Sequence, residues 1–291
     1  MKHHLISAAV VIGVALSGCA TTGTPQLSNK EKAIEVMNNL GTADRSSLDY
    51  ISDKTYIQHN LGVASGKAGL YGFLDKFPTI AKDEDGTVVR AFQDGDYVVT
   101  HSYVKAFNSA VFDVFRFEDG LIVEHWDNNQ KPANKPNPSG HTMTDGATQI
   151  TDLDKTQQNK ILIKNLIQDV FLEGQFNKIT QYISQETYTQ HNPSIADGLK
   201  GLTDAFAGMA AQGQTVRYEK IHAILGEGNF VLVISGGEIN GEPTAFYDLF
   251  RVANGKAVEH WDVLKTIPSK DKQMNVNGKF NFPASAMNLS K

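Results

Sequence analysis

A segment of sixteen residues occurs twice in this chain. Residues 112–127 read FDVFRFEDGLIVEHWD, and residues 247–262 read YDLFRVANGKAVEHWD. In each copy an alternating segment is followed by Asp-Gly or Asn-Gly and then by a second alternating segment, which predicts two antiparallel strands joined by a tight turn. Chance does not produce two segments this similar. We therefore interpret the chain as a tandem duplication in which each copy forms its own domain.

The repeat extends beyond the hairpin. Four further pairs of segments match: 56–60 with 188–192, 66–70 with 198–202, 95–99 with 228–232, and 137–140 with 275–278. The distance between matching positions grows slowly along the chain, which places small insertions in the loops between motifs. We predict a first domain over residues 28–146 and a second domain over residues 153–284.

The N-terminus has the features of a targeting segment. A polar head precedes an apolar run over residues 5–16, which is too short to cross a bilayer as a helix. The sequence Leu-Ser-Gly-Cys at residues 16–19 resembles the lipobox of bacterial lipoproteins. We expect a signal peptide over residues 1–18, lipidation of Cys19 and a tether over residues 19–27. An ordinary secretory signal with an incidental cysteine is the alternative.

The composition limits where the protein is expected in the cell and which partners it is expected to bind. Cys19 is the only cysteine, so no internal disulfide can form. In lipoproteins a residue other than Asp after the lipidated cysteine favours the outer membrane, and here that residue is Ala20. We therefore expect a lipid-anchored protein of the bacterial cell envelope, on the periplasmic face of the outer membrane if the organism is Gram-negative. The net charge of −5 and the lack of a basic cluster argue against nucleic acid as a partner.

Helical patterns precede strand patterns in both units. Ser28 and Glu31 form a capping box that opens a helix running to about Leu40, and apolar spacing over residues 163–171 predicts a helix that Gly174 ends. Further helical segments are expected at 45–51, 70–77, 176–183 and 202–210, and strands at 87–92, 97–107 and in the hairpins. Helices grouped before an antiparallel sheet indicate the α+β class.

Alternation along the strands assigns side chains to faces. On the first strand of the first hairpin, one face carries Asp113, Phe115 and Phe117. On the second strand, one face carries Val123, His125 and Asp127, and the other face carries Ile122, Glu124 and Trp126. Two registers fit the turn. A three-residue loop pairs Asp113 with His125 and leaves Arg116 near Glu124, a candidate ion pair. A two-residue turn instead places Asp113 beside Trp126.

These motifs together resemble those of the SnoaL-like polyketide cyclases. They are the QHN element, the G-x-x-G-L helix entry, the GD-Y-V-V strand, the D-x-F-R…V-E-H-W-D hairpin and the N-x-x-G tail. That family belongs to the nuclear transport factor 2-like fold, with ketosteroid isomerase and limonene epoxide hydrolase. The resemblance covers both units. It implies two tandem cystatin-like cones, each with a curved antiparallel sheet packed on N-terminal helices around a mostly apolar pocket.

The resemblance also implies roles for particular residues. Enzymes of this fold use an Asp or an Asp/His pair inside the cone as general acid and base. The catalytic candidates are Asp127, His59, His101, His125 and Asp113. The ligand-binding candidates are Tyr103, Phe115, Trp126, His191, Asp248, His260, Trp261 and Asp262. In the second unit Ile234 and Gly236 replace His101 and Tyr103, so we expect catalysis from the first unit.

The chemistry expected of such a site is proton transfer. Burial raises the pKa of a carboxyl group, so it can take a proton from a carbon next to a carbonyl while a neighbouring His or acid stabilises the enolate. The same residues also fit structural roles. Trp packs at an interface, Asp accepts hydrogen bonds from backbone N–H groups, and the QHN element forms a turn. No His spacing typical of a metal site occurs in the strands, and no nucleotide or nucleophile motif stands in a suitable context, so we expect no metal and no cofactor.

The sequence thus predicts an exported lipoprotein that acts on a small apolar carbonyl compound by isomerase, cyclase or aldol chemistry. Polyketide cyclisation itself is disfavoured, because an exported protein lies away from cytoplasmic polyketide synthesis. The alternative is a non-catalytic envelope lipoprotein that binds a small hydrophobic ligand. We expect the two units to pair through their sheets, as homodimers of this fold do. A purely structural second unit would have its pocket filled by its own side chains around Ile234.

Overall fold

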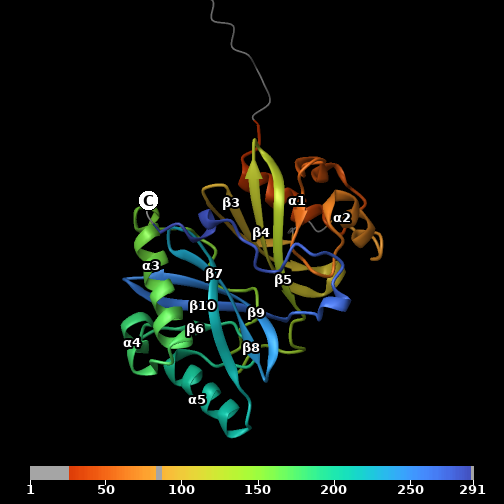
Figure 1. The fold of residues 1–291 in the computed structure, drawn as a ribbon. Helices are drawn as coiled ribbons and strands as arrows, with labels where there is room; N and C mark the ends of the chain where they lie inside the picture. The colour runs from red at the N-terminus through yellow and green to blue at the C-terminus, as the bar shows by residue number, and fades with distance from the viewer. Residues whose placement is uncertain (1–25, 83–86, 290–291) are drawn as a thin grey trace, which may run out of the picture.

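The computed structural model describes residues 26–82 and 87–289, which form two α+β units (Figure 1). The first unit runs from α1 to β5 and the second from α3 to β10. The first contains α1 (Asn29–Asn39), β1 (Ile57–Gln58), α2 (Gly66–Leu74), β2 (Val88–Asp94), β3 (Tyr97–Val104), β4 (Ser109–Glu118) and β5 (Leu121–Gln130). The second contains α3 (Thr156–Leu166), α4 (Ile179–Tyr182), β6 (Thr189–Gln190), α5 (Gly198–Ala211), β7 (Val216–Glu227), β8 (Phe230–Ile239), β9 (Glu242–Ala253) and β10 (Lys256–Thr266).

The two sheets have the same topology. Their strand orders are β1-β5-β4-β3-β2 and β6-β10-β9-β8-β7. The long strands are antiparallel, whereas the short strands β1 and β6 pair in parallel with β5 and β10. This agreement confirms the predicted α+β class and the repetition of one fold.

Local signals in the sequence explain the helix ends. Ser28 accepts a hydrogen bond from the Glu31 main chain, and the Glu31 carboxylate accepts one at 2.7 Å from the Ser28 main chain, so the predicted capping box is confirmed. Helix α3 continues as a π-helical segment, Ile167–Leu172. It stops before Gly174, whose φ of 69° lies in the left-handed region that glycine adopts without strain.

The predicted two-residue turn is confirmed, but neither predicted partner of Asp113 is correct, because each hairpin contains a β-bulge. Asp119 and Gly120 form a two-residue turn with φ values of 50° and 76°, and Phe117 then pairs with Ile122. One residue on β5 is extra at the next step, so Asp113 pairs with Asp127 beyond the bulge. The second hairpin shifts at the equivalent place.

The bulge changes which side chains share a face. His125 and Asp127 remain on the face of Asp113, as alternation predicts. Ile122 moves to that side too and joins the core beneath the helices. The predicted contact between Arg116 and Glu124 is confirmed, with 2.7 Å between Nε and Oε2. A bulge cannot be recognised in the alternation itself, because an apolar residue such as Val123 fits either face.

Three apolar cores hold the described part of the chain together. One lies between the helices and the sheet of the first unit, and a second lies between the helices and the sheet of the second unit. The third is shared: Phe112 and Trp126 of the first sheet pack in one cluster with Leu232, Tyr247 and Trp261 of the second. The faces of the two sheets that point away from their helices therefore pack on each other.

The segments that follow the two sheets are exchanged between the units. The linker (residues 131–152) follows β5, and its Asn137 donates hydrogen bonds to main-chain carbonyls of the second unit. The tail (residues 267–289) follows β10 and crosses the first unit, as the dark blue segment in Figure 1 shows, where Asn275 makes the equivalent contacts. These contacts cross the predicted domain boundaries at residues 146 and 153.

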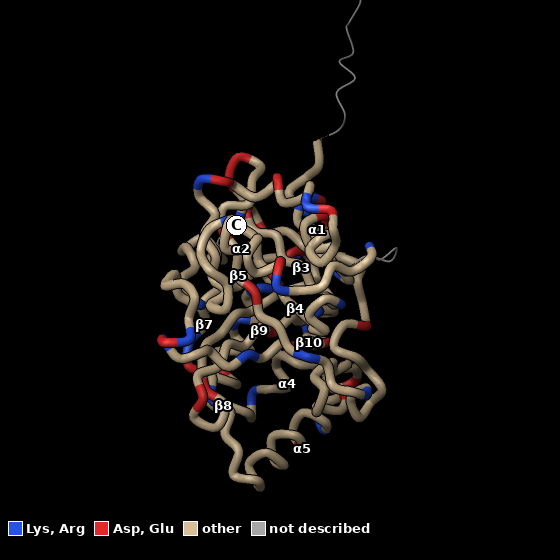
Figure 2. Tube along the Cα trace, turned by 90° about the vertical axis from the view of Figure 1, so that its right-hand side faces the viewer, with Lys and Arg blue, Asp and Glu red and all other residues tan. Residues whose placement is uncertain are grey.

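Acidic and basic residues lie interspersed along the trace (Figure 2). Within residues 26–82 and 87–289, no helix combines the length and the apolar character needed to cross a membrane. The predicted signal peptide, Cys19 and most of the predicted tether lie outside the described residues.

Candidate functional site

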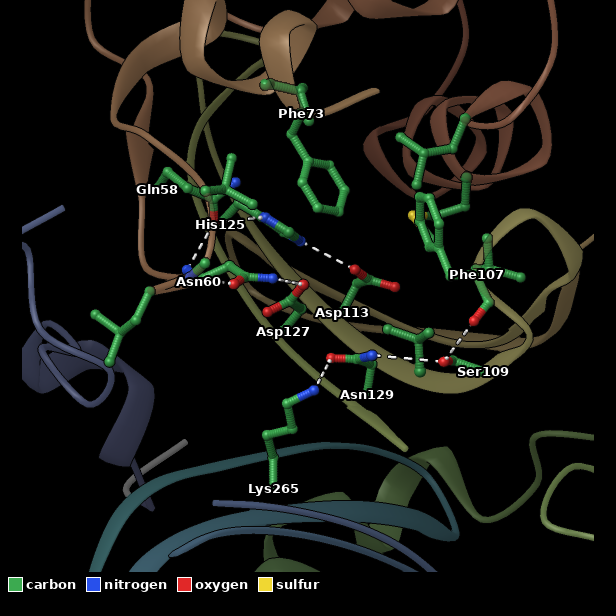
Figure 3. A pocket seen from close by; sticks show the side chains of 18 of the residues that line it. Gln58, Asn60, Phe73, Phe107, Ser109, Asp113, His125, Asp127, Asn129 and Lys265 are labelled. Carbon is green, nitrogen blue, oxygen red and sulfur yellow. Dashed lines mark hydrogen bonds and ion pairs between the residues drawn. The ribbon is translucent and has the colours of Figure 1, made fainter. Parts of the chain in front are cut away.

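A cavity of about 480 Å³ lies in the first unit, between the helices and the sheet. Its walls are mainly apolar and include Val36, Met37, Leu70, Phe73, Phe107 and Val111. Polar side chains from β1, the segment that follows it, β4 and β5 form its floor, and they are Gln58, Asn60, Asp113, His125 and Asp127 (Figure 3). A mostly apolar space of this size with a few convergent polar groups is typical of a small-molecule site.

Strand pairing explains why these polar groups converge. Asp113 on β4 lies opposite Asp127 on β5, and His125 is two residues back along the same face. Strand β1 pairs in parallel with β5, so Gln58 lies beside His125. Asn60 follows two residues later and points the same way. Three separate segments thus place their polar side chains on one patch of floor.

One proton lies between His125 and Asp113. The Gln58 Oε1 atom accepts a hydrogen bond from the Asn60 main chain at 2.8 Å, which fixes this oxygen as an acceptor. The His125 Nδ1 atom, 3.1 Å away, must therefore donate to it. The other ring nitrogen, Nε2, lies 3.0 Å from Asp113 Oδ1. Burial raises the pKa of Asp113, so this carboxyl group is able to hold the shared proton.

Asp127 differs from Asp113 because one of its oxygens is open. Its Oδ2 atom accepts a hydrogen bond of 2.7 Å from the Asn60 amide. Its Oδ1 atom lies 3.9 Å from the Lys279 ammonium and has no hydrogen bond with any described residue. Asp127 lines the cavity. The floor thus combines an open carboxylate with a proton-carrying pair.

His59 does not reach the cavity, although the sequence suggested it. Gln58 and Asn60 face the floor, so the residue between them faces the other way. The His59 ring donates through Nδ1 to the Gly278 carbonyl at 2.7 Å and stacks on Trp126, with ring centroids 4.5 Å apart. Trp126 is fully buried in the core between the sheets. These two predicted site residues are placed in the inter-sheet packing.

His101 and Tyr103 also lie away from the cavity. The His101 ring stacks on Phe112 at 4.1 Å and contacts Arg90, in the layer between the sheets. Burial, reinforced by the charge of Arg90, holds the pKa of His101 well below its usual value. Tyr103 donates a hydrogen bond to Asn108 at 2.7 Å, outside the cavity lining. Phe115, by contrast, lines the cavity and stacks on His125 at 4.8 Å.

The second unit repeats the polar network. His260 Nε2 lies 3.1 Å from Asp248 Oδ1, and Asp262 Oδ2 accepts a hydrogen bond of 2.7 Å from Asn192. Gln190 is the partner of His260 Nδ1, at 3.0 Å. Burial raises the pKa of Asp262 to about 6. Its Oδ1 atom is buried without a hydrogen-bond partner among the described residues.

The space above that second network is filled. The Tyr218 hydroxyl donates to the Asp248 carboxylate at 3.2 Å, and its ring packs on Phe246 with 4.2 Å between centroids. Phe246 occupies the repeat position that Val111 occupies in the first unit. The filling residues are therefore Tyr218 and Phe246. Ile234, which we expected to fill the pocket, lies in the core between the sheets.

His191 and Trp261 lie on the same outer face as their counterparts in the first unit. The His191 ring stacks on Trp261 at 4.7 Å, and its Nε2 atom lies 3.0 Å from Glu259. Neither of these ligand-binding candidates lines the cavity of the first unit.

The floor could in principle hold a metal ion. Donor atoms of Asp113, His125 and Asp127 lie within 4.8 Å of one another, as do those of Asp248, His260 and Asp262, and of His141, Asp145 and His191. At the first of these sets, His125 already faces Asp113, and the Lys279 ammonium adds positive charge beside Asp127. This ammonium group repels a divalent metal ion, so the donor set suits proton transfer better than metal binding.

Sequence reasoning missed several residues of this site. Gln58 and Asn60 are repeated in the second unit as Gln190 and Asn192, and that repetition was the available signal. Lys265 and Lys279 also line the cavity, although they follow the second unit in the chain. Nothing in the sequence indicates that they would reach the first unit, because the exchange of linker and tail is a property of the tertiary structure.

A cone of helices and antiparallel sheet around one apolar cavity with an acidic floor defines the class of nuclear transport factor 2-like domains. Residues 34–125 match the family model of the SnoaL-like domain. The matched residues make up most of the first unit, which is therefore similar to the SnoaL-like domain, and the second unit is related to the first through the repeat.

Each of the solved structures with a similar fold matches a part of this chain about as long as one unit. TsrD from Streptomyces laurentii is 19% identical, covering 36% of this chain and 89% of its own, with a TM-score of 0.29. An LEH-like epoxide hydrolase from M. tuberculosis is 20% identical, covering 38% and 85%, with a TM-score of 0.31. An NTF2-like protein of unknown function from Cytophaga hutchinsonii is 17% identical, covering 41% and 95%, with a TM-score of 0.28. No protein with a curated description matches the chain.

Proposed function

We propose that the first unit catalyses general acid–base proton transfer on a small apolar carbonyl compound, without a cofactor. Asp127 is the base, and the Asp113–His125 pair supplies a hydrogen bond to the carbonyl oxygen. The second unit, whose equivalent space is filled, acts as the structural partner that packs on the first sheet. This pairing of sheets is the covalent counterpart of a homodimer.

The observation that carries the proposal is the difference between the two carboxyl groups on one floor. Asp127 Oδ1 has no hydrogen bond with a described residue and borders the cavity. Asp113 is buried, with a raised pKa and a shared proton. A buried carboxyl group that shares a proton, next to a second carboxyl group with an oxygen open to the cavity, can supply an acid and a base to one substrate.

The protons balance in such a cycle. Asp127 takes a proton from the carbon next to the carbonyl, and the electron pair of that C–H bond moves to give an enolate. The proton that Asp113 and His125 share moves out of that hydrogen bond and is donated in a hydrogen bond to the enolate oxygen. The proton on Asp127, or a solvent proton that has replaced it there, then goes to carbon, either to the original atom or to another atom of a conjugated system. The net result is exchange or isomerisation, with no proton gained or lost by the protein.

Proton exchange in heavy water tests this without knowledge of the natural substrate. The full chain is incubated with small apolar ketones, and loss of the α-proton signal is followed by ¹H NMR. We expect Asp127→Asn to slow the enzyme-dependent exchange by about 10²–10⁴-fold, the usual contribution of a general base. The matched variant Asp262→Asn should leave the rate unchanged. Equal rates for wild type and Asp127→Asn would overturn the proposal.

A second candidate is a binding protein that does not turn its ligand over. It is favoured by the mutual hydrogen bonding of Gln58, Asn60, His125 and Asp113, because a binding site has less need of open reactive groups. This candidate predicts that ligands bind in the cavity while no ketone shows enzyme-dependent exchange.

We also propose that the protein is an exported lipoprotein held in the cell envelope by a lipid on Cys19. The lipobox-like sequence at residues 16–19 supports this. Labelling of cells with radioactive palmitate should mark the wild-type chain, and the label should be absent from Cys19→Ser. Equal labelling of both chains, or of neither, would count against the anchor.

A further inference from the structure

Three lysine side chains gather at one end of the cavity. Lys131 follows β5, Lys265 lies at the end of β10, and Lys279 lies on the tail. Lys265 reaches from the second unit to Asn129, with 3.0 Å between Nζ and Oδ1. In Figure 3 it approaches from the side of the floor opposite Phe73. The lysine end of the cavity is thus formed jointly by both units.

Lys279 is the most enclosed of the three. Its side chain is only 10% exposed, and burial lowers its pKa. The ammonium donates to the main-chain carbonyl of Asp127 and lies 3.9 Å from that residue's Oδ1 atom. An ammonium group has three donors, so two are left for a further acceptor in the cavity. A buried charge with unused donors favours an anionic partner.

The two residues that precede Lys279 hold it in place. Asn277 donates from its side chain to the Gln58 carbonyl at 2.8 Å, and the Gly278 carbonyl accepts from His59. These are contacts of the exchanged tail with the first unit. The position of the ammonium is therefore set by the fold and does not depend on a ligand.

The charges that line the cavity are unequal. Three lysines and two aspartates, Asp113 and Asp127, line the cavity, and burial keeps Asp113 toward its neutral form. Positive charge is thus in excess at one end of a space whose opposite end is apolar. Such a distribution is complementary to a molecule with an apolar body and an anionic end.

We propose that the ligand of this cavity is an apolar carboxylic acid. Its carboxylate lies between Lys265 and Lys279, and its apolar body extends toward Phe73 and Phe107. The carboxylic acid specifies the class of molecule on which the proposed function acts. It rests on the proposed function only in taking Asp127 as the base. Lys279 is then a binding residue that the tail of the second unit supplies to the site of the first.

Calorimetric titration of the full chain with octanoate and with octan-1-ol tests the proposal, since the two probes share one chain and differ in charge. Octanoate should bind at least about 10-fold more tightly, because a hydrogen bond between charged groups is worth more than a neutral one. Lys279→Met should weaken octanoate binding by about 10-fold or more and leave octan-1-ol unchanged. The matched control is Lys272→Met, an exposed lysine on the same tail outside the cavity lining.

Lys265→Met provides a second variant if Lys279→Met does not fold, because its side chain is exposed and should tolerate substitution. It should also weaken octanoate selectively. Equal binding of the two probes, equal loss of both in the lysine variants, or no binding of either would overturn the proposal. If octanoate binds but no ketone exchange occurs, only the proposed proton transfer is contradicted. If ketone exchange occurs but octanoate does not bind, only the proposal of a carboxylic acid ligand is contradicted.

Discussion

Asn137 and Asn275 occupy equivalent places in the repeat, and each binds the main chain of the other unit. Asn137 donates from its amide to the carbonyls of Gln190 and Ile195, at 2.6 and 3.0 Å. Asn275 donates to the carbonyls of Asn60 and Val63, at 2.7 and 2.8 Å. The exchange is reciprocal in its contacts but not in its effect, because only the tail brings a lysine, Lys279, to the cavity of the other unit.

Asn275→Ala should therefore affect the site as well as stability. It leaves two main-chain carbonyls without their donor, which costs about 1–3 kcal/mol in the free energy of unfolding. It also loosens the segment that carries Lys279, so octanoate binding should weaken. Urea unfolding and calorimetric titration measure the two effects.

Asn137→Ala is the matched control for that experiment. It should cost a similar free energy of unfolding, because it removes the equivalent pair of hydrogen bonds, while octanoate binding stays at the wild-type level. If both variants weaken binding equally, the tail has no particular role at the site.

Val111→Phe should close the cavity. Phe246 stands at the equivalent position and packs on Tyr218 in the second unit, so the fold accommodates a phenyl ring there. We expect the variant to fold with a melting temperature near that of wild type and to bind neither octanoate nor octan-1-ol. Retained binding with wild-type affinity would place the ligand elsewhere.

Asp262 should make stability depend on pH. Its pKa is about 6 in the folded chain and 3.8 ordinarily, so the folded state holds the proton between these values while the unfolded state has lost it. The stabilising contribution of the protonated group is complete below pH 3.8 and is lost as the pH rises through 6. The difference corresponds to roughly 3 kcal/mol.

Asp262→Asn should remove this dependence, since an amide does not titrate in that range. Relative to wild type, the variant should gain stability between pH 4 and pH 7 in urea unfolding experiments. Asp154→Asn, at an exposed position, is the control and should follow the wild-type curve. A constant difference between Asp262→Asn and wild type across this range would show that Asp262 does not titrate as described.

His125 and His59 should behave differently when substituted. His125→Gln removes the partner of Asp113, so ketone exchange should fall by about 10²-fold or more and its pH profile should change. His59→Gln removes the stacking on Trp126 and should lower the melting temperature, while the pH profile of the remaining activity keeps its shape. An altered profile in His59→Gln, with an unaltered one in His125→Gln, would reverse these assignments.

Several features were available in the sequence because they depend on residues close together in the chain. The capping box at Ser28, the glycine stop at Gly174 and the Asp119-Gly120 turn are local, and each has a conformational preference of its own. The duplication was visible because both copies retain the same turn and strand residues. Alternation correctly grouped Asp113, His125 and Asp127, since neighbouring side chains of a strand point to opposite faces.

The bulge and the orientation of the QHN element were decided only in the folded chain. A bulge changes the register without leaving a distinct residue pattern, so both predicted partners of Asp113 were wrong although the two-residue turn was correct. The parallel pairing of β1 with β5 turned Gln58 and Asn60 inward and His59 outward, and strand alternation alone does not specify which face is inside.

By itself, the sequence determined that the chain folds as two copies of one α+β unit with a shared acidic and imidazole motif, because those features follow from local preference and from repetition. The tertiary structure alone decided which copy keeps a cavity and which residues complete it. Phe246 and Tyr218 fill one unit, and the crossing tail brings Lys279 to the other. Both outcomes depend on contacts between residues far apart in the chain, which no local pattern encodes.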